Sequence, residues 1–505
     1  MPTSATTRRH KAAILVSLGL LGLVGADGLR TGAVHPDSAA PAVAALTYAQ
    51  WSARAAQTLE LQYYDGAGRW QVCVPSGCGA TNSDWGADAM TYALFLYWQI
   101  TRAPSVPPIM KALTTTAPTY DPGTDSWSDV PMWDSVAASR AYQVTGDAAA
   151  LNKAKAAFAY VDTDQRAQFA AGACPTVHYQ LPNGGGSHLK TLETDSNYVK
   201  AAILLFQITR DRVYLDKAEA TYAAIRRYFL EPASSLYTVY VFDDGRQCTP
   251  LAGRYFGSVN GNMIWSGYHL AEATGTTAYR DQALATAHAV QQRLGDGTGI
   301  YASLQAENDV TEPLVEAMYA LAALDHQAFA RNWLLAAANT SVSAVATTGA
   351  YGRFFAGPAP AAPVTVWQTN GGLALQFAAA ALSPDGVPTE TGFWDDATAV
   401  SHELRVTTTA SSFTFTGRAI AIIGTIGEQC CESGHARVFI DGVETTDRTG
   451  IWQNKSSSGH SLPGSVLFAW RWPSAGVHTI SIQPGVPNGK EGGSFFHMTG
   501  YRLVA

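Results

Sequence analysis

Residues 125–147 read DSWSDVPMWDSVAASRAYQVTGD, a polar loop with a tryptophan that runs into a helix and then into a tight turn. Ser128 and Asp129 precede Pro131, and this order is a helix-start signal because proline is tolerated at the first helical position. The turn Thr145-Gly146-Asp147 ends the helix. The same order of loop, helix, turn and helix recurs along the chain, which predicts a repeat of helical hairpins.

The repeat is clearest in four turns, which contain Thr101, Thr145, Thr209 and Thr274. Each joins a helix end to a new amphipathic helix, and a weaker fifth copy starts at Tyr319. Helical periodicity predicts twelve helices, over residues 47–64, 84–101, 105–115, 131–144, 148–161, 195–208, 213–229, 259–273, 277–294, 311–324, 326–340 and 366–382. Six hairpins suggest a closed (α/α)6 toroid over residues 46–382, with an open solenoid as the competing architecture. The long connections, rich in glycine and aromatic residues, favour the toroid.

The pattern changes after Leu382. Residues 383–390 are expected to be a linker, and helical spacing is lost beyond them. Alternating β-branched stretches such as SFTFTG and ARVFIDGVE follow, separated by turn residues. This alternation predicts a small all-β domain, a jelly roll or β-sandwich, over residues 391–505. The fold class expected is therefore mainly α, a toroid followed by this β domain.

The N-terminus has the features of an export signal. Arg8, Arg9 and Lys11 precede an apolar run over residues 12–24, and small residues lead to a cleavage site after Ala26. We expect a signal peptide over residues 1–26, a linker over 27–45 and a secreted, extracellular protein. An uncleaved anchor is the alternative, although the apolar run is short for a membrane span. No membrane span is expected after cleavage.

Composition and net charge limit the classes of partner that the protein can bind. Of the 505 residues, 47% are hydrophobic and 14% charged, which fits a compact globule, and the net charge of -7 argues against a nucleic-acid partner. An exported chain should pair most of its six cysteines. The two expected pairs are Cys73 with Cys78 and Cys174 with Cys248, and the adjacent residues 430 and 431 would form a vicinal disulfide or pair elsewhere. Because the sequence has no CxxC pair or histidine cluster, we expect no metal site. We also expect no cofactor, and we expect a monomer.

The loops that enter alternate helices are rich in polar and aromatic side chains. In a toroid these loops converge on one end of the ring. Any single polar residue there could be an ordinary helix cap. Six polar entries with four tryptophans among them suit sugar binding better, because rings can stack on sugars. The predicted substrate-binding residues are Trp85, Asp88, Trp127, Trp133, Asn260 and Trp367.

Residues 133–158, WDSVAASRAYQVTGDAAALNKAKAAF, resemble the second inner helix of glycoside hydrolase family 76, the endo-α-1,6-mannanases. The family pattern there is a pair of consecutive aspartates, a spacer, two tryptophans and a helix that ends in Thr-Gly-Asp. Counting back from Thr145 aligns Asp129 with the first aspartate and Val130 with the second. The resemblance covers roughly residues 45–382 and implies a toroid that binds a polysaccharide.

In that family the adjacent carboxylates act as nucleophile and general acid/base. Val130 cannot transfer a proton, so the resemblance implies only Asp129 as a catalytic group. The second carboxyl that a glycosidase needs is sought among three further candidates, Asp134, Asp125 and Asp195.

Three functions remain open. The first is a secreted hydrolase that cuts within an α-linked cell-wall or microbial polysaccharide, mannan-like or related. The second is a glycan-binding or wall-associated protein that has lost catalysis at Val130. The third is a polysaccharide lyase, with His178, Tyr179 and His188 as its candidates. The C-terminal domain resembles galactose-binding-like carbohydrate-binding modules, with Trp452, Trp470 and Trp472 as candidates for sugar stacking.

Overall fold

The computed structural model describes residues 45–78, 85–116, 127–164, 172–179, 188–302, 310–361, 363–406, 409–426, 435–445, 451–452, 461–484 and 496–505. The expected signal peptide, Asp125 and the cysteines at 430 and 431 lie outside these ranges.

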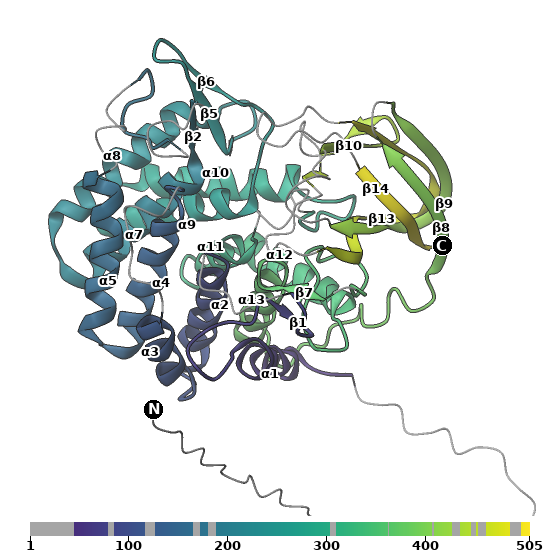
Figure 1. The fold of residues 1–505 in the computed structure, drawn as a ribbon, viewed down its shortest axis with the longest axis horizontal. Coiled ribbons are helices and arrows are strands. Elements are labelled where there is room, and N and C mark those ends of the chain that lie inside the picture. Colours follow the sequence, from purple (N-terminus) through teal and green to yellow (C-terminus); the bar gives the residue numbers. More distant parts are fainter. Residues whose placement is uncertain are drawn as a thin grey trace, which may run out of the picture. The chain divides into compact units, whose positions relative to one another are not determined.

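Twelve α-helices lie within the described residues, one for each helix that the periodicity predicts (Figure 1). They are α1 (Tyr48–Gln57), α2 (Trp85–Thr101), α3 (Val106–Thr116), α4 (Val130–Thr145), α5 (Ala148–Ala159), α7 (Leu192–Thr209), α8 (Arg212–Tyr228), α9 (Gly257–Thr274), α10 (Thr277–Arg293), α11 (Glu312–Ala323), α12 (Ala328–Ser341) and α13 (Val366–Leu382). Short π-helical turns extend α1 and α5.

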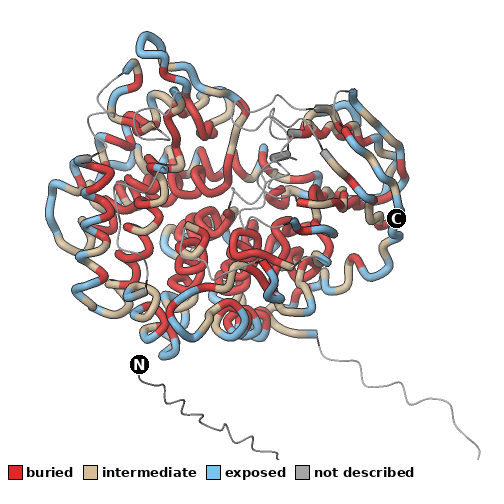
Figure 2. Tube along the Cα trace, viewed as in Figure 1, coloured by how far each residue is buried: buried red, intermediate tan, exposed pale blue. Residues whose placement is uncertain are grey.

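Six of these helices form an inner ring. α2, α4, α7, α9, α11 and α13 are buried over most of their length, whereas their partners are buried on one side only (Figure 2). Each inner helix packs against the next, and α13 packs against α2, so the ring closes. Strand β1 (Cys73–Val74) also pairs with β7 (Val364–Thr365), which joins the two ends of the ring. The fold is therefore the predicted closed toroid rather than an open solenoid.

The repeated threonines have a common structural role. In Thr101, Thr145, Thr209 and Thr274 the hydroxyl donates to the carbonyl four residues earlier, at 2.7–2.8 Å. The same oxygen accepts the N–H two residues later, at 3.1–3.2 Å. Each threonine thus satisfies a carbonyl in the last helical turn and a donor in the next loop. The recurrence in the sequence marks one kind of helix end used four times.

Two small sheets are formed by the segment just before α7 and by the segments between α8 and α9. One contains β2 (Leu189–Thr191), β5 (Tyr240–Asp243) and β6 (Cys248–Pro250), and the other pairs β3 (Leu230–Glu231) with β4 (Leu236–Tyr237). The predicted disulfides Cys73–Cys78 and Cys174–Cys248 are both formed. The second disulfide joins the segment 172–179 to β6.

The C-terminal part is all β, as predicted. Its antiparallel sheet has the order β11-β10-β13-β9-β14-β8, with β12 paired to β10. The strands are β8 (Thr398–Val406), β9 (Ser411–Ile426), β10 (His435–Ile440), β11 (Val443–Glu444), β12 (Ile451–Trp452), β13 (Leu462–Pro484) and β14 (Phe496–Val504). Register shifts along β13 and β9 let these long strands bend.

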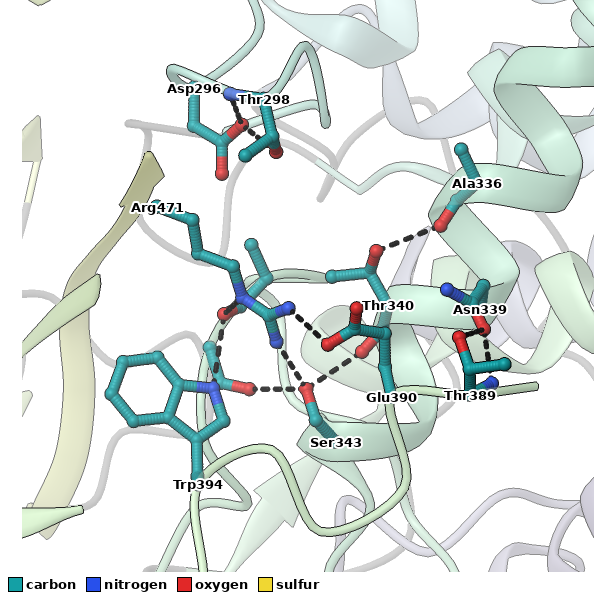
Figure 3. A network of polar contacts seen from close by, with 12 residues as sticks. Asp296, Thr298, Ala336, Asn339, Thr340, Ser343, Thr389, Glu390, Trp394 and Arg471 are labelled. Carbon is teal, nitrogen blue, oxygen red and sulfur yellow. Dashed lines mark hydrogen bonds and ion pairs between the residues drawn. The ribbon is translucent and has the colours of Figure 1, made fainter. Parts of the chain in front are cut away.

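Buried polar contacts join this β domain to the toroid (Figure 3). Arg471 of β13 donates from Nε to the Ala356 carbonyl at 2.7 Å and from Nη2 to the Ser343 hydroxyl at 2.8 Å. Its Nη1 pairs with Glu390 at 3.0 Å. Phe354 of the toroid also packs among apolar residues of the β domain. The domain is therefore packed against the ring and is more than a tethered module.

Candidate active site

The N-terminal ends of the six inner helices lie together, and we call this region the entry end. Ring contacts join the starts of α2, α4 and α13, with Trp85 5.9 Å from Trp133 and 5.8 Å from Trp367 between centroids. The Glu312 N–H at the start of α11 donates to Asn370 of α13 at 3.0 Å. Within the described residues, these helix starts and their polar and aromatic side chains therefore converge, as the sequence predicts.

Asp129 directly precedes α4 at the entry end. It occupies the N-cap position but its side chain makes no capping hydrogen bond to its helix. The residue is partly exposed. Helix capping therefore does not explain this aspartate, and its carboxyl remains the first candidate for chemistry. Val130 follows it as the first residue of α4.

Glu193, which the sequence did not single out as catalytic, lies at the start of α7, the neighbour of α4. It is partly exposed. The Tyr240 hydroxyl donates to its Oε2 at 3.1 Å and the Thr191 hydroxyl approaches the same oxygen at 3.3 Å. Burial raises the pKa of Tyr240 well above its ordinary value, and Glu193 and Asp129 raise it further. Both carboxyl groups therefore act on the same buried phenol.

Asp195, a predicted catalytic residue, is fully buried two positions further along α7. Its Oδ1 lies 2.6 Å from Nδ1 of His178, and its carboxylate also accepts the His178 backbone N–H. Burial raises the pKa of Asp195, and His178 opposes that rise. The pair holds the segment 172–179 against α7, so this position corrects both the catalytic role expected of Asp195 and the lyase role expected of His178.

Asp134 and Asp88 belong to a different group of charges. Both raise the pKa of Lys153 on α5, opposing a larger lowering that burial causes. Lys153 also donates to the Thr114 carbonyl at the end of α3. Both carboxyl groups therefore lie within electrostatic range of a lysine of the outer helices, and Asp134 is partly exposed whereas Asp88 is buried. The roles predicted for them, catalysis for Asp134 and sugar binding for Asp88, stay predictions.

The four predicted sugar-stacking tryptophans differ in exposure. Trp133 and Trp367 are 4% and 2% exposed, and Trp133 stacks on Tyr92 inside the ring. Both rings are packed in the core at the entry end, so neither ring presents a face to a sugar. Trp85 is partly exposed and Trp127 is 38% exposed. Only these two remain candidates for stacking.

Asn260 is fully buried, and its side-chain groups bond to backbone. Its amide donates to the Tyr237 and Phe256 carbonyls, and its oxygen accepts the Tyr237 N–H at 2.9 Å. Asn260 thus ties β4 to the start of α9 and is not placed to contact a sugar, contrary to the prediction.

A cluster of buried charges lies deeper on the inner helices, and the sequence analysis missed it. Arg140 of α4 pairs with Glu316 of α11, and Lys200 of α7 donates to Glu316 at 2.7 Å and to Asn262 of α9 at 3.0 Å. We call Arg140, Lys200, Glu312 and Glu316 the axial cluster. Its signal in the sequence was a single charge within each of the apolar stretches AASRAY, NYVKAA and PLVEAM.

The pKa values of the two glutamates of the axial cluster are shifted in opposite directions. Burial would raise the pKa of Glu316, but Arg140 and Lys200 lower it to about 2. Burial and the charge of Glu316 raise the pKa of Glu312 to about 8. Among the described residues, neither carboxyl oxygen of Glu312 has a hydrogen-bond partner, and both are buried. Burial and the neighbouring Glu316 thus favour the protonated form of Glu312.

The part of the chain that the structure describes contains no group of three or more acidic, histidine or cysteine side chains placed to hold a metal ion. In the same residues no helix is long and apolar enough to span a membrane. The entry end offers the partly exposed carboxyl groups of Asp129 and Glu193 and the ring of Trp85, which suit acid–base chemistry on a hydroxylated ligand.

Solved structures share the toroid fold. An α-1,6-mannanase of glycoside hydrolase family 76 from a Salegentibacter species, an inactive variant with two adjacent aspartates replaced and α-1,6-mannotetrose bound, is similar with TM-score 0.58 and 18% identity, over 67% of this chain and 100% of that chain. A family 76 glycoside hydrolase from a bovine Bacteroides thetaiotaomicron strain gives 0.57 and 15%, over 67% and 78%. A family 76 α-mannanase from Bacteroides thetaiotaomicron gives 0.56 and 16%, over 66% and 95%.

These likenesses confirm, at the level of fold, the resemblance to family 76 that the sequence indicated. No protein-family model matches the sequence, and no curated protein matches it.

Proposed function

We propose that this protein is an exported glycoside hydrolase that cuts within an α-linked glycan, with α-1,6-linked mannan as the first substrate to test. Asp129 supplies one of its two catalytic carboxyl groups, and Trp85 and Trp127 stack on the glycan. The choice of linkage comes from the mannanases that share the fold.

One observation carries the proposal. Asp129 is a partly exposed carboxyl group at the entry end that does not cap its own helix. Polar residues before a helix usually serve as caps, and the Asp129 side chain does not have that role. Glycoside hydrolysis requires a carboxyl group that can reach the scissile bond, and the partly exposed Asp129 fits that requirement, whereas the fully buried Asp195 does not.

A second candidate function is glycan binding without cleavage. Val130 favours it, because the resemblance to family 76 assigns a catalytic aspartate to this position. The two functions differ in whether another carboxyl group completes the chemistry.

The test measures release of reducing ends from a panel of linear α-1,6-mannan, branched α-mannan, arabinan, galactan and glucan. Wild type is compared with Asp129→Asn and with Asp216→Asn, an exposed change on outer helix α8. Oligosaccharide release by wild type and Asp216→Asn, lost in Asp129→Asn, supports the hydrolase. Binding to one polymer with no release from any supports the binding protein instead.

A further inference from the structure

The starts of α4 and α7 are joined by a buried pair of hydroxyl groups. Ser128 Oγ lies 2.6 Å from Thr194 Oγ1, and both residues are almost completely buried. Ser128 donates its proton to the Tyr179 carbonyl at 2.7 Å. Thr194 must then be the donor in the contact between the two hydroxyls, because Ser128 has only one proton to give. Each hydroxyl has one defined role, so the contact holds the two helix starts at one spacing.

The residues next to this contact in the chain are both acidic, and both lie near enough to the Tyr240 hydroxyl to raise its pKa. Asp129 directly follows Ser128, and Glu193 directly precedes Thr194. Asp129 and Glu193 are both partly exposed, unlike the buried Asp195. The entry end therefore presents two carboxyl groups on adjacent inner helices, although the sequence has no second aspartate beside Asp129.

The Glu193 carboxylate is oriented by a hydrogen bond from a buried side chain. Tyr240 is 6% exposed and donates to Oε2 of Glu193 at 3.1 Å. Tyr240 lies on β5, and its backbone partner on β2 is Thr191, the N-cap residue of α7. A carboxylate oriented by a buried donor on a paired strand is pre-organised, which is what a catalytic group requires.

We propose that Glu193 is the second catalytic carboxyl group, replacing the one lost at Val130, and that Tyr240 is its positioning residue. The inference rests on the proposed function and names the residue that would complete it. Asp129 and Glu193 thus come from two neighbouring helices rather than from consecutive positions of one loop.

The chemistry needs water as its only co-reactant. One carboxyl group gives its proton to the glycosidic oxygen as the bond from that oxygen to the anomeric carbon breaks. In a one-step reaction the water oxygen bonds to the anomeric carbon at the same time, and its proton passes to the other, ionised carboxyl group. In a two-step reaction that carboxylate first bonds to the anomeric carbon as an ester; water then displaces it as a carboxylate, and the water proton returns to the first carboxyl group.

The experiment measures hydrolysis of the polymer that wild type cleaves, using Glu193→Gln, Glu193→Ala and Tyr240→Phe. Glu193→Gln should lower kcat by about 10²–10⁴-fold, the usual contribution of a general acid or base. Azide or formate should restore part of the activity of Glu193→Ala, which would not happen if Glu193 were only structural. The matched control is Glu231→Gln, because Tyr255 donates to Glu231 on β3 in the same way. It should stay within threefold of wild type.

Tyr240→Phe should lower kcat by less than Glu193→Gln, with KM little changed. It should also move the acidic limb of the pH–activity profile to higher pH, because a carboxylate that loses a donor ionises less readily. If wild type cleaves a polymer and Glu193→Gln cleaves it at a rate within threefold of wild type, the catalytic role of Glu193 is overturned. The protein would still be a hydrolase. A wild type that cleaves no polymer in the panel overturns the hydrolase, and this assignment with it.

Discussion

Ser128 and Thr194 share a hydrogen bond between hydroxyl groups, with 2.6 Å between the two oxygens. The bond crosses from the loop before α4 to the first turn of α7. The ring therefore has a specific link between adjacent inner helices, next in the chain to the partly exposed acidic residues Asp129 and Glu193.

The link can be removed with little change of shape. Thr194→Val replaces the donor hydroxyl with a methyl group and leaves the buried Ser128 oxygen without that donor. We expect a loss of about 1–2 kcal/mol in the free energy of unfolding, and a fall in kcat of about tenfold because the two carboxyls lose their spacing. Thr194→Ser, which keeps the hydroxyl, should retain most of both. Equal losses in kcat for the two variants would contradict the link as the cause.

Glu312 predicts a pH dependence of stability. Its pKa is about 8 in the folded protein against an ordinary 4.5, so the folded chain keeps a proton that the unfolded chain releases. Wild type should therefore lose stability as pH rises from about 4.5 to about 8, by at most about 1.4 kcal/mol per pH unit from this group. Glu312→Gln removes the ionisation and should gain stability relative to wild type over the same range.

The measurement is denaturant unfolding of both proteins at pH 5, 6, 7 and 8. Glu316→Gln is the contrasting variant, because the folded pKa of Glu316 is about 2, so its contribution to stability is fully present over this whole pH range and is lost only at lower pH. Removing it also leaves Arg140 and Lys200 without their shared carboxylate, which should cost about 3–5 kcal/mol. Parallel curves for wild type and Glu312→Gln would show that Glu312 is ionised in the folded state.

The helices were predictable because their signals are local. Periodicity, Pro131 at a helix start and Gly146 in a left-handed turn at a helix end are properties of neighbouring residues. The repeated threonines are equally local, since each bonds within its own turn. Short-range chemistry therefore gave the twelve helices, and six hairpins then left few architectures.

The site was less predictable because burial decides which of the candidate residues can reach a ligand, and the sequence does not show burial directly. Asp195 and Glu193 lie two positions apart on one helix, yet one is paired with His178 inside the core and the other is partly exposed. Trp133 and Trp127 differ in the same way. Exposure of each depends on which elements pack over it, and the hydrogen bond from Tyr240 to Glu193 joins residues 47 positions apart.

Arg471 should couple the β domain to the toroid. Its side chain is 5% exposed and contacts the Ala356 carbonyl, Ser343 and Glu390. Arg471→Met leaves these groups without their donor, and we expect a loss of about 2–4 kcal/mol in the free energy of unfolding. Arg405→Met is the matched control, because Arg405 is 60% exposed beside an exposed glutamate, and it should cost at most about 1 kcal/mol. Equal losses would mean that Arg471 does not join the two parts.

The last prediction concerns Val130, the first residue of α4. An aspartate there should be tolerated, since acidic residues in the first helical turn are favourable. If Asp129 and Glu193 form the catalytic pair, both catalytic carboxyl groups are already present, so Val130→Asp alone should not raise kcat. In a Glu193→Gln background the new carboxyl lies next to Asp129 and should restore activity at least tenfold above that of Glu193→Gln.

Hydrolysis of the preferred polymer by wild type, the two single variants and the double variant checks this, with Val130→Asn as the isosteric control that carries no acid. A rise in kcat of more than tenfold for Val130→Asp alone would contradict the pairing, because it would mean that the missing carboxyl had been the limiting group all along.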